Sequence, residues 1–389
     1  MRKIAVIVEK SRAYGRALCE GIADAAQKED AWSLDWMDYS VFDTPERLRG
    51  YDGIIARLLD DRSAERIAKL KIPTVDVFCR RDYGIFGRAD CDHAAIARKA
   101  AEHFAMMRFT KIAFCGFDGV HFSDARRKAF IEAVEDRIHV PVNCYSTPLK
   151  AIQEFNEKVI RNERLERCAD ERQLLKWIKS LPEHTAIFCC HDMRAYHVSR
   201  LCRENGISVP NERAILGADN DRLVCSFTTP MLSSIDIPAH RVGVAAAAIL
   251  SRMMREENAR KNPPAIFVKP REIFRRESTE VYDIEPKWLA DAMLFIHKHL
   301  GENISAVDVV RFTGRSHTAV HTAFKREFGE GMQKLIARMR LENAEELLQN
   351  TELPIKEIAK RSGFASLQYF CRMFKAVYKQ SAEEYRDAR

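Results

Sequence analysis

Short apolar segments typical of strands alternate with amphipathic, helix-like segments along the first 280 residues, and the alternation ends there. The predicted strands cover Ile4–Val8, Gly53–Ala56, Thr74–Phe78, Lys111–Cys115, Ala186–Cys190 and Ala214–Leu216. The predicted helices cover Arg16–Gln27, Ala94–Met107, Phe122–Val134 and Met193–Asn205. Strands that alternate with helices form parallel sheets with helices on both faces. Because one sheet does not comfortably hold 280 residues, we expect two α/β lobes.

After residue 280 the strand-like segments disappear and the chain becomes helical and more basic. Residues 286–389 contain 17 Lys and Arg against 13 Asp and Glu, so they hold four of the chain's seven net positive charges. We therefore expect an α/β domain over 1–280, a short polar linker over 281–285 and an all-α domain over 286–389. A basic domain permits a nucleic-acid partner without requiring one.

The helical domain nearly repeats a two-helix frame. Ser305 and Asp308 predict a capped short helix, after which the chain turns at Gly314. Fifty residues later, Pro354 suits the first turn of a second short helix, which turns at Gly363. Each turn leads into a further helix that we expect to be capped by serine, at Ser316 and Ser366.

The longer helix of each frame has a predicted apolar side. In the first frame it consists of Val320, Ala323, Phe324 and Phe328, and in the second of Phe370, Met373, Phe374 and Val377. A helix over Met332–Gln349, about 27 Å long, joins the two frames. Such a spacer can hold two recognition helices about one DNA turn, roughly 34 Å, apart. Two helix-turn-helix units in tandem therefore indicate a DNA-binding domain.

Residues 286–386 resemble the DNA-binding domain of the AraC/XylS transcription regulators. The matching positions are Phe324-Lys325, Gly329, Arg340, Ala344, Leu347-Leu348, Ile355, Ile358-Ala359, Gly363-Phe364, Tyr369-Phe370, Phe374-Lys375 and Tyr385-Arg386. The chain departs from the family pattern at Val310, Lys379 and Ala382, where Ala, Gly and Pro are usual. These departures concern local packing and the angle of the last helix.

The resemblance implies which side chains read DNA. The implied base-reading residues are Thr318, His321 and Thr322, with His317 beside them, and Leu367, Gln368 and Arg372. Gln suits adenine, Arg suits guanine, and the methyl groups of Leu or Thr suit thymine. We expect Ser316, Lys325, Ser366 and Lys375 to contact phosphates, which position the protein without reading sequence. The spacing of His317 and His321 would also suit a metal, but no third ligand lies nearby in the sequence.

The α/β part has no Gly-rich phosphate loop, nucleophile elbow or H-E-x-x-H motif. Its polar residues instead gather after predicted strands, where open α/β sheets bind ligands. They are Glu9–Arg16, Asp90–Asp92, His191–Arg194 and Asp219–Asp221. Carboxylate, amide and guanidinium groups from several loops can bind adjacent hydroxyls, and Tyr14 can stack on a sugar ring.

These segments resemble the effector domain of LacI/GalR repressors, which is similar to periplasmic sugar-binding proteins. The similarity lies in Ile112–Gly116 after the Asp92 helix, and in Ile215–Asn220 before Leu232–Ile235. The N-terminal DNA-binding headpiece of that family is not found before the first predicted strand. An effector domain followed by an AraC-type domain resembles the bacterial xylose-operon regulators, with further similarity at Ala13-Tyr14, Arg16, Asp219-Asn220 and Arg275–Thr279.

The second resemblance implies a monosaccharide effector, D-xylose first. The implied ligand contacts are Tyr14, Arg16, Asp92, Asp192, Arg194, Asp219 and Asn220. Four arginines are expected near the cleft: Arg12, Arg16, Arg88 and Arg194. Their positive charges leave open the alternative that the effector is a phosphorylated or acidic sugar.

The leading interpretation is a sugar-controlled transcription regulator, an activator and not an enzyme. We expect it to bind double-stranded promoter DNA as a homodimer, with RNA polymerase as a further candidate partner. The alternative is an α/β sugar-processing enzyme tethered to DNA, for which the sequence offers no nucleophile or acid/base pair. We expect buried free thiols among the eleven cysteines and no metal at Cys189, Cys190 and His191. We further expect no cofactor, no membrane span and a cytoplasmic location.

Overall fold

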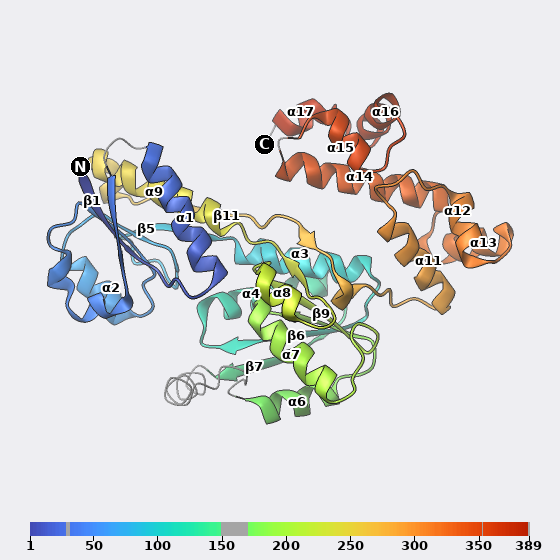
Figure 1. The fold of residues 1–389 in the computed structure, drawn as a ribbon, viewed down its shortest axis with the longest axis horizontal. Coiled ribbons are helices and arrows are strands. Elements are labelled where there is room, and N and C mark those ends of the chain that lie inside the picture. The colour runs from blue at the N-terminus through green and yellow to red at the C-terminus, as the bar shows by residue number, and fades with distance from the viewer. Residues whose placement is uncertain (29–31, 149–169, 352, 388–389) are drawn as a thin grey trace. The chain divides into compact units, whose positions relative to one another are not determined.

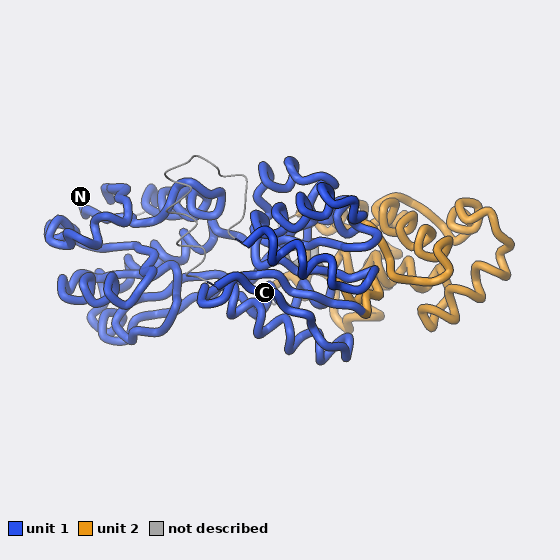
Figure 2. Tube along the Cα trace, turned by 90° about the horizontal axis from the view of Figure 1, so that it is seen from below, with its two compact units in different colours: residues 1–103, 111–279 blue, residues 104–110, 280–389 orange. Residues whose placement is uncertain are grey.

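The computed structural model describes residues 1–28, 32–148, 170–351 and 353–387. They form two compact units, shown in different colours in Figure 2. Unit 1 comprises residues 1–103 and 111–279, and unit 2 comprises 104–110 and 280–389. The division at residue 279 falls beside the linker expected at 281–285.

Unit 1 contains two six-stranded sheets, one in each of two lobes. The first sheet is fully parallel, and its strands in spatial order are β11 (Ala265–Val268), β5 (Gly87–Cys91), β4 (Thr74–Asp76), β3 (Gly53–Ala56), β1 (Arg2–Ile7) and β2 (Trp32–Met37). The helices associated with this lobe are α1 (Ala13–Lys28), the short η1 (Tyr39–Asp43) and η2 (Pro45–Leu48), α2 (Asp61–Ala68), α9 (Ala239–Arg255) and α10 (Glu257–Lys261).

The first sheet is buried on both faces because alternate residues of its strands enter two different cores. Ile4 and Val6 pack with Leu18 of α1 and Val242 of α9. Ala5, Ile7 and Ile54 pack with residues of η1 and α2, including Val41, Ala64 and Ile67. Figure 1 accordingly shows α1 and α9 on one side of the sheet and α2 on the other. The predicted doubly covered α/β arrangement is confirmed.

The second sheet has strand order β12 (Ile273–Phe274), β10 (Ser233–Ile235), β9 (Arg213–Ala218), β8 (Thr185–Cys189), β6 (Lys111–Asp118) and β7 (Val142–Pro148). Only β12 runs antiparallel to its neighbour. Its helices are α3 (His93–Met106), α4 (His121–Arg137), α6 (Glu171–Ser180), α7 (Asp192–Glu204), α8 (Arg222–Phe227) and the short η3 (Glu277–Thr279). One face packs against α6 and α7, and on the other Phe114 and Phe188 meet Phe130 of α4.

The chain passes between the two lobes three times. It leaves the first sheet after β5, returns after β10 to form α9 and β11, and crosses again to form β12. Neither lobe is therefore a continuous piece of sequence.

Unit 2 is helical, as predicted. Its helices are α11 (Lys287–Lys298), α12 (Ala306–Thr313), α13 (His317–Phe328), α14 (Met332–Asn350), α15 (Ile355–Arg361), α16 (Leu367–Tyr378) and α17 (Ala382–Asp387). The pairs α12–α13 and α15–α16 are the two predicted helix-turn-helix units. Ser316 Oγ accepts a hydrogen bond from Ala319 N at 3.3 Å, and Ser366 Oγ accepts one from Tyr369 N at 3.2 Å, so both predicted caps are present.

The turn of the second helix-turn-helix unit packs against the loop after α11. A Cβ on Gly363 would lie 2.0 Å from the carbonyl oxygen of Leu300, and Gly363 also has φ +79°. Arg340 of α14 donates to three carbonyl oxygens of the same loop, those of Leu300, Glu302 and Ile304, at 3.3, 2.7 and 3.0 Å. Only glycine fits this turn, because a side chain would collide with the loop that Arg340 holds.

The apolar side predicted for the last recognition helix is wrong at one position. Val377 is 54% exposed, whereas Phe370 and Phe374 are fully buried. Tyr378 takes the inward place instead: it stacks on Phe374 at 4.3 Å between ring centroids, and its hydroxyl donates to Glu345 Oε2 at 2.8 Å. The sequence pattern favoured Val377 because it considers only hydrophobicity, whereas Tyr378 is half-buried and its hydroxyl has a hydrogen-bond partner.

Several strands are absent from the sequence prediction: β2, β5, β7, β10, β11 and β12. Most are short or lie at a sheet edge, and apart from β11 and the two-residue β12 they contain polar residues or glycine that interrupt an apolar run. Of the ten described cysteines, seven are buried, in agreement with the expected buried thiols. No helix of the described residues is both long and apolar enough to cross a membrane.

We predict that Lys379→Gly stabilises unit 2 by up to about 1 kcal/mol. Lys379 ends α16 with φ +63°, the left-handed conformation that Gly329 adopts with φ +72° at the end of α13. An L side chain is strained there, and removal of the Cβ relieves the strain. Denaturant unfolding of the full chain, followed through the unit 2 transition, measures the change.

Lys379→Ala is the matched control. It removes the hydrogen bond from Lys379 Nζ to Ala376 O, 2.9 Å long, but keeps the strained Cβ. It should therefore give no stabilisation. Equal stability of the wild type and Lys379→Gly would show that the backbone strain is negligible.

Candidate functional site

A cavity of about 460 Å³ lies in unit 1, where the carboxyl ends of strands from both sheets converge. The first lobe contributes residues that follow β1, β3 and β4 and residues in and after β5. The second lobe contributes residues that follow β8 and β9 and residues of α4. Parallel sheets place their ligand sites at this edge, where strand ends leave polar groups open.

Charged groups of both signs line the cavity. The cationic residues are Arg12, Arg16, Arg57 and Arg126, and the acidic residues are Glu9, Asp90, Asp192, Asp219 and Asp221. Arg57 pairs with Glu9, which also accepts a hydrogen bond from Tyr39 OH at 3.0 Å. Arg16 donates to the carbonyl oxygens of Lys10 and Ser11 at 3.1 and 2.9 Å. The cavity is thus rich in both donors and acceptors.

Asp192 connects several elements of the second lobe at the cavity wall. Its Oδ1 accepts a hydrogen bond from Ser234 Oγ at 2.6 Å, and its Oδ2 accepts one from Asp221 N at 2.8 Å. A Cβ on Gly217 would lie 2.2 Å from Oδ1, so glycine there leaves space for the carboxylate. Burial, with the nearby Asp219 carboxylate, raises the pKa of Asp192 to about 7.

Asp219 follows β9 in a strained backbone conformation. Its φ is +122° and that of Asn220 is +50°, conformations that L residues rarely adopt and that cost about 1–3 kcal/mol each. Within the described parts of the chain, no protein donor hydrogen-bonds the Asp219 carboxylate. Enclosure in the cavity raises its pKa to about 6, although Arg126 and Arg12 act in the opposite direction. Asp219 therefore presents to the cavity a carboxylate that accepts no hydrogen bond from the described residues.

Aromatic side chains form apolar walls on both sides of the cavity. Phe78 follows β4 and lies under the Arg57 guanidinium at 4.6 Å, and Phe122 belongs to α4 and stacks on His191 at 5.8 Å. Aromatic rings beside hydrogen-bonding groups suit a molecule with one apolar face and several hydroxyls.

Four of the seven predicted ligand residues line the cavity: Tyr14, Arg16, Asp192 and Asp219. The structure does not place Asp92, Arg194 or Asn220 there. Asp92 instead caps α3, accepting a hydrogen bond from Ala95 N at 2.8 Å. The neighbouring Asp90 belongs to β5 and lines the cavity, whereas Asp92 follows the strand and is turned toward the start of α3.

Arg194 is fully buried and bound inside the second lobe, away from the cavity. Its two terminal nitrogens donate to the two oxygens of Asp170 at 3.1 and 2.9 Å. Burial would raise the pKa of Asp170, but Arg194 outweighs that effect and lowers it to about 2. The expected ligand role is replaced by a structural ion pair.

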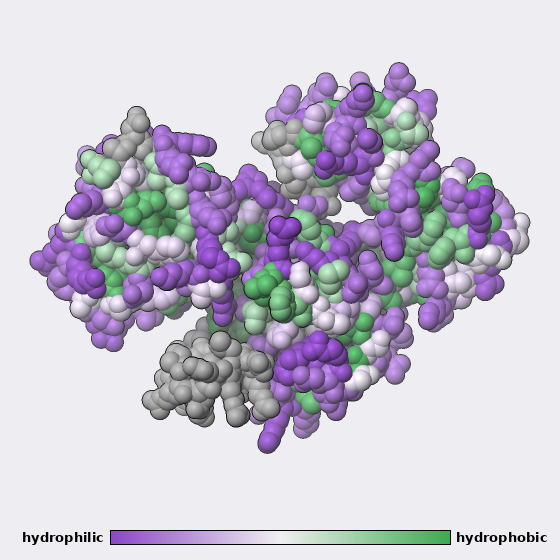
Figure 3. Space-filling view, in the orientation of Figure 1, coloured by the Kyte–Doolittle hydropathy of each residue, from purple (hydrophilic) through white to green (hydrophobic). Residues whose placement is uncertain are grey.

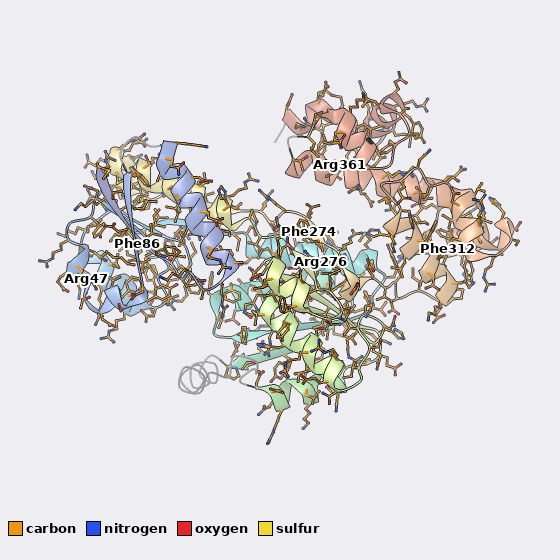
Figure 4. The ribbon with its side chains drawn as sticks, in the orientation of Figure 1. Arg47, Phe86, Phe274, Arg276, Phe312 and Arg361 are labelled. Atoms are coloured by element: carbon orange, nitrogen blue, oxygen red, sulfur yellow. The ribbon has the colours of Figure 1, made fainter. Side chains whose placement is uncertain are left out.

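Asn220 is likewise engaged by the protein. Its Oδ1 accepts a hydrogen bond from Arg276 at 2.8 Å, and its backbone N–H donates to Ser234 Oγ at 3.0 Å. Arg276 lies over the ring of Phe274, and Figure 4 labels both side chains. Asn220 therefore joins β9, β10 and the segment after β12 and does not line the cavity.

Several cavity residues are not among the ligand contacts named from the sequence: Glu9, Asp90 and Cys91 lie in the polar segments identified there, whereas Arg57 and Arg126 lie outside them. Arg57 directly follows β3, so the strand-end rule would have identified it. Arg126 gives no such signal: it belongs to α4 and is only 3% exposed. Among the described residues, only Asp90, Cys91 and His93 bring three potential metal-ligand atoms within 4.8 Å of one another.

The predicted DNA-contacting residues lie at the surface of unit 2. On α13 and its cap, the exposed residues are Ser316, His317, Thr318, His321, Thr322 and Lys325. On α16 and its cap, they are Ser366, Leu367, Gln368, Arg372 and Lys375. Hydrophilic side chains with scattered apolar ones cover the visible face of this unit in Figure 3. Each recognition helix thus buries one face and leaves the predicted reading face open.

Arg372 is placed by an aromatic neighbour. Its guanidinium lies 5.3 Å from the centre of the Tyr369 ring, and Tyr369 is 41% exposed. The Tyr369 ring in turn lies 6.1 Å from that of Phe364. A cation–π contact reduces the number of conformations that the guanidinium samples.

Two protein families match parts of the chain. Residues 101–279 match the periplasmic binding protein-like domain, and residues 309–388 match a helix-turn-helix domain. The first match covers the second lobe and its return segments, and the second covers both helix-turn-helix units. Both agree with the architecture predicted from the sequence.

Curated relatives match over nearly the whole chain. The xylose operon regulatory protein of Haemophilus influenzae is 28% identical, with 99% of this chain and 98% of the relative covered. The xylose operon regulatory protein of Escherichia coli K12 is 26% identical, with 99% and 97% covered. These relatives are named as regulators and not as enzymes.

Solved structures of transcription regulators are also similar to this chain, over its whole length or over unit 1. The structure of the xylose-binding transcription activator xylR has a TM-score of 0.60 at 26% identity and covers 99% of this chain and 98% of its own. A LacI family transcriptional regulator from Enterococcus faecium with bound ribose has a TM-score of 0.56 at 19% identity and covers 72% and 98%. The second similarity supports the fold of unit 1.

We predict that the ligand-free protein is more stable at pH 5 than at pH 8, in part because of Asp192 and Asp219. The folded-state pKa values, about 7 and about 6, lie above the ordinary carboxyl value. The folded protein therefore holds protons that the unfolded chain releases above about pH 4. This contribution is present at acidic pH and is lost as the pH rises through 6 to 7.

Asp219→Asn should reduce the difference in thermal stability between pH 5 and pH 8. Asn is neutral at both pH values, so the gain at pH 8 should be about 1–3 kcal/mol. Asp136→Asn, which changes an exposed residue of α4, is the control and should leave the difference unchanged. The same pH dependence in Asp219→Asn as in the wild type would contradict the assignment.

Proposed function

We propose that this chain, a DNA-binding transcription regulator with a periplasmic-binding-protein-like domain and an AraC-type helix-turn-helix domain, binds a pentose in the cavity of unit 1, with D-xylose as the first candidate. The observation that carries the sugar assignment is the cavity itself. It combines aromatic walls with acceptors from two lobes, at the strand ends where such sheets bind ligands.

The charges of the cavity favour a neutral sugar over an acidic one. Arg57 is paired with Glu9, and Arg126 lies close enough to Asp219 to oppose the burial that raises the pKa of that carboxyl. Two of the arginines that supported the acidic-sugar alternative do not line the cavity. Arg194 is bound to Asp170, and Arg88 is paired with Asp82 at 2.7 Å. An added sugar phosphate or carboxylate would meet several carboxylates without an excess of cations.

The choice of D-xylose rests on the relatives. The curated relatives that span the chain are named xylose operon regulatory proteins, and the similar full-length structure is titled a xylose-binding activator. A cavity of about 460 Å³ has room for a pentose and some water. Tyr14, Arg16, Asp192 and Asp219 are the proposed contacts, and Arg57, Asp90 and Arg126 join them.

Unit 2 is proposed to read promoter DNA through α13 and α16. Gln368 and Arg372 would contact base edges, with Leu367, Thr318, His321 and Thr322 beside them, whereas Ser316, Lys325, Ser366 and Lys375 would contact phosphates. His317 is proposed as an additional contact, since it stacks beside His321 with the ring centroids 6.1 Å apart.

The remaining parts of the proposal concern assembly and regulation. We infer a homodimer, because two copies of unit 2 would occupy repeated half-sites more tightly than one. Sugar binding would favour the closed arrangement of the two lobes and thereby change DNA occupancy. The proposed outcome is activation through RNA polymerase, in the cytoplasm where the DNA lies.

We expect Asp219→Ala to weaken sugar binding without unfolding the protein. Loss of a hydrogen bond to a charged acceptor costs about 1–3 kcal/mol, or roughly 5–150-fold in affinity. Calorimetric titration of the full chain with D-xylose, L-arabinose, D-ribose and D-glucose measures this loss and ranks the sugars. It also tests the enzyme alternative, because turnover would consume the sugar.

Asp92→Ala and Asn220→Ala are informative controls. Asp92 caps a helix outside the cavity, so its removal should leave the sugar affinity intact. Asn220→Ala should lower stability, because Arg276 loses its acceptor, more than it lowers affinity. Unchanged affinity in a folded Asp219→Ala protein would refute the proposed role of this carboxylate.

We expect Arg372→Ala and Lys375→Ala to affect DNA binding differently. Loss of a guanine contact by Arg372 should cost about 1–3 kcal/mol on the cognate site and relax the preference at one base pair. Loss of a phosphate contact by Lys375 should weaken binding to all sequences alike and lower the salt slope by about one unit. Both variants are titrated at fixed salt against a cognate duplex and its single-base variants.

The outcome for Arg372 separates two roles. If Arg372→Ala weakens every duplex equally, the guanidinium contacts phosphate and does not read a base. Tyr369→Phe is the matched control, because it keeps the ring that holds Arg372 and should keep the base preference.

A further inference from the structure

Three neighbouring residues of the cavity wall form a relay that sugar binding alone does not require. His93 Nε2 lies 3.5 Å from Asp90 Oδ2, and His93 Nδ1 lies 3.4 Å from Cys91 Sγ. The imidazole therefore lies between a carboxylate and a thiol. A carboxylate, an imidazole and a thiol in this order are the arrangement that activates a sulfur nucleophile.

The relay is held in place by further contacts. Asp90 Oδ1 accepts hydrogen bonds from Cys91 N at 2.7 Å and from Tyr14 OH at 3.4 Å, so its other oxygen is directed to His93. The exposed fractions of the Asp90 and His93 side chains are only 7% and 11%. Desolvation would lower the pKa of His93, but Cys91 and Asp90 outweigh it and raise the pKa to about 9. The imidazole thus favours its charged form beside the sulfur.

A buried cation lies on the other side of the thiol. Arg126 Nη2 is 3.8 Å from Cys91 Sγ, and Arg126 is 3% exposed and lines the cavity. Its Nε has no hydrogen-bond partner among the described residues. A guanidinium next to a thiol favours the thiolate, and its positive charge can stabilise a nearby oxygen that gains negative charge.

The same three residues are less suited to a metal ion. Ligands of one ion must direct one donor atom each to a common point, whereas His93 presents different nitrogens to Asp90 and to Cys91. Arg126 beside the sulfur would also repel a cation. His93 thus lies at ion-pair distance from a carboxylate and in contact with a thiol, a placement that suits proton exchange with a nucleophile.

We propose that Cys91 is a reversible covalent site for short hydroxyaldehydes, including the open-chain form of an aldose. The thiolate sulfur attacks the carbonyl carbon and forms the C–S bond, while the C=O π pair moves to the oxygen. That oxygen takes the proton from His93 and becomes the hydroxyl of a hemithioacetal. Sulfur, carbonyl compound and proton are all retained in the adduct, so no oxidant or further reactant is needed.

The aldehyde class follows from the groups around Cys91. Asp192 and Asp219 offer acceptors for the hydroxyls of a bound molecule, and Arg126 lies beside the sulfur where the carbonyl oxygen would develop charge. This inference rests on the proposed function for the hydroxyl-binding part of the cavity. The thiol chemistry itself requires only Asp90, Cys91, His93 and Arg126.

The direct test is carbon-13 NMR of the full chain with glycolaldehyde labelled at the carbonyl carbon. The wild type should show a protein-bound hemithioacetal carbon that is absent in Cys91→Ser and present in Cys144→Ser, since Cys144 is an exposed thiol of the same unit. Ethylene glycol labelled with carbon-13 has the same length without a carbonyl and should give no adduct. Imine carbons formed on lysines would remain in Cys91→Ser and are thereby distinguished.

A second measurement keeps the inference testable if Cys91→Ser does not fold. Iodoacetamide modification of Cys91 in the wild type, followed by peptide mass spectrometry, should be slowed by glycolaldehyde and not by ethylene glycol. In His93→Gln the modification rate at pH 7 should fall at least about fivefold, because the sulfur loses the imidazole that exchanges its proton. The rate at Cys144 should not change.

The outcomes separate this inference from the proposed function. Binding of methyl β-D-xylopyranoside, a closed ring without a free carbonyl, reports the sugar site alone. If this sugar binds while no adduct forms, or if the adduct persists in Cys91→Ser, the covalent site is refuted and the sugar site stands. If the adduct forms at Cys91 and no sugar binds, the covalent site stands and the proposed effector is refuted.

Discussion

The cavity depends on the burial of carboxylates where two parallel sheets meet. A buried carboxylate is costly unless donors surround it, and Asp192 meets that condition with Ser234 Oγ and Asp221 N. These bonds connect the start of α7 to β10 and to the segment after β9. Gly217 contributes by having no side chain, because a Cβ there would collide with the carboxylate. The edge of the second sheet that faces the cavity therefore depends on this one acid.

Some polar side chains of unit 1 have hydrogen-bond or ion-pair partners within the protein, and others remain available to a ligand. Arg194 and Asp170 satisfy each other inside the second lobe, and Asn220 is held by Arg276. The Asp219 carboxylate has no such partner among the described residues, and it lines the cavity. Groups that remain unsatisfied at a cavity are the ones a ligand can bind, since its hydroxyls or carbonyl restore the missing hydrogen bonds.

In unit 2, rigidity comes from contacts between parts that the sequence separates. The turn at Gly363 approaches Leu300 too closely for any side chain, and Arg340 binds three carbonyl oxygens of the same loop. The two helix-turn-helix units are therefore connected through α14 and also through this loop. A fixed separation of α13 and α16 is what two recognition helices need to enter successive stretches of major groove.

The sequence alone determined the architecture of both units, the tandem helix-turn-helix frame and its serine caps, because these follow from periodicity, turn residues and local hydrogen bonds. It also indicated that Asp192 and Asp219 lie at the cavity, because both follow strands directly. It could not separate Asp90 from Asp92, or recognise that Arg194, Asn220 and Val377 face the wrong way for their predicted roles. It missed Arg126, which reaches the cavity from a helix, and the relay through His93. Those outcomes depend on which side chains find partners across the chain, and only the tertiary structure brings such partners together.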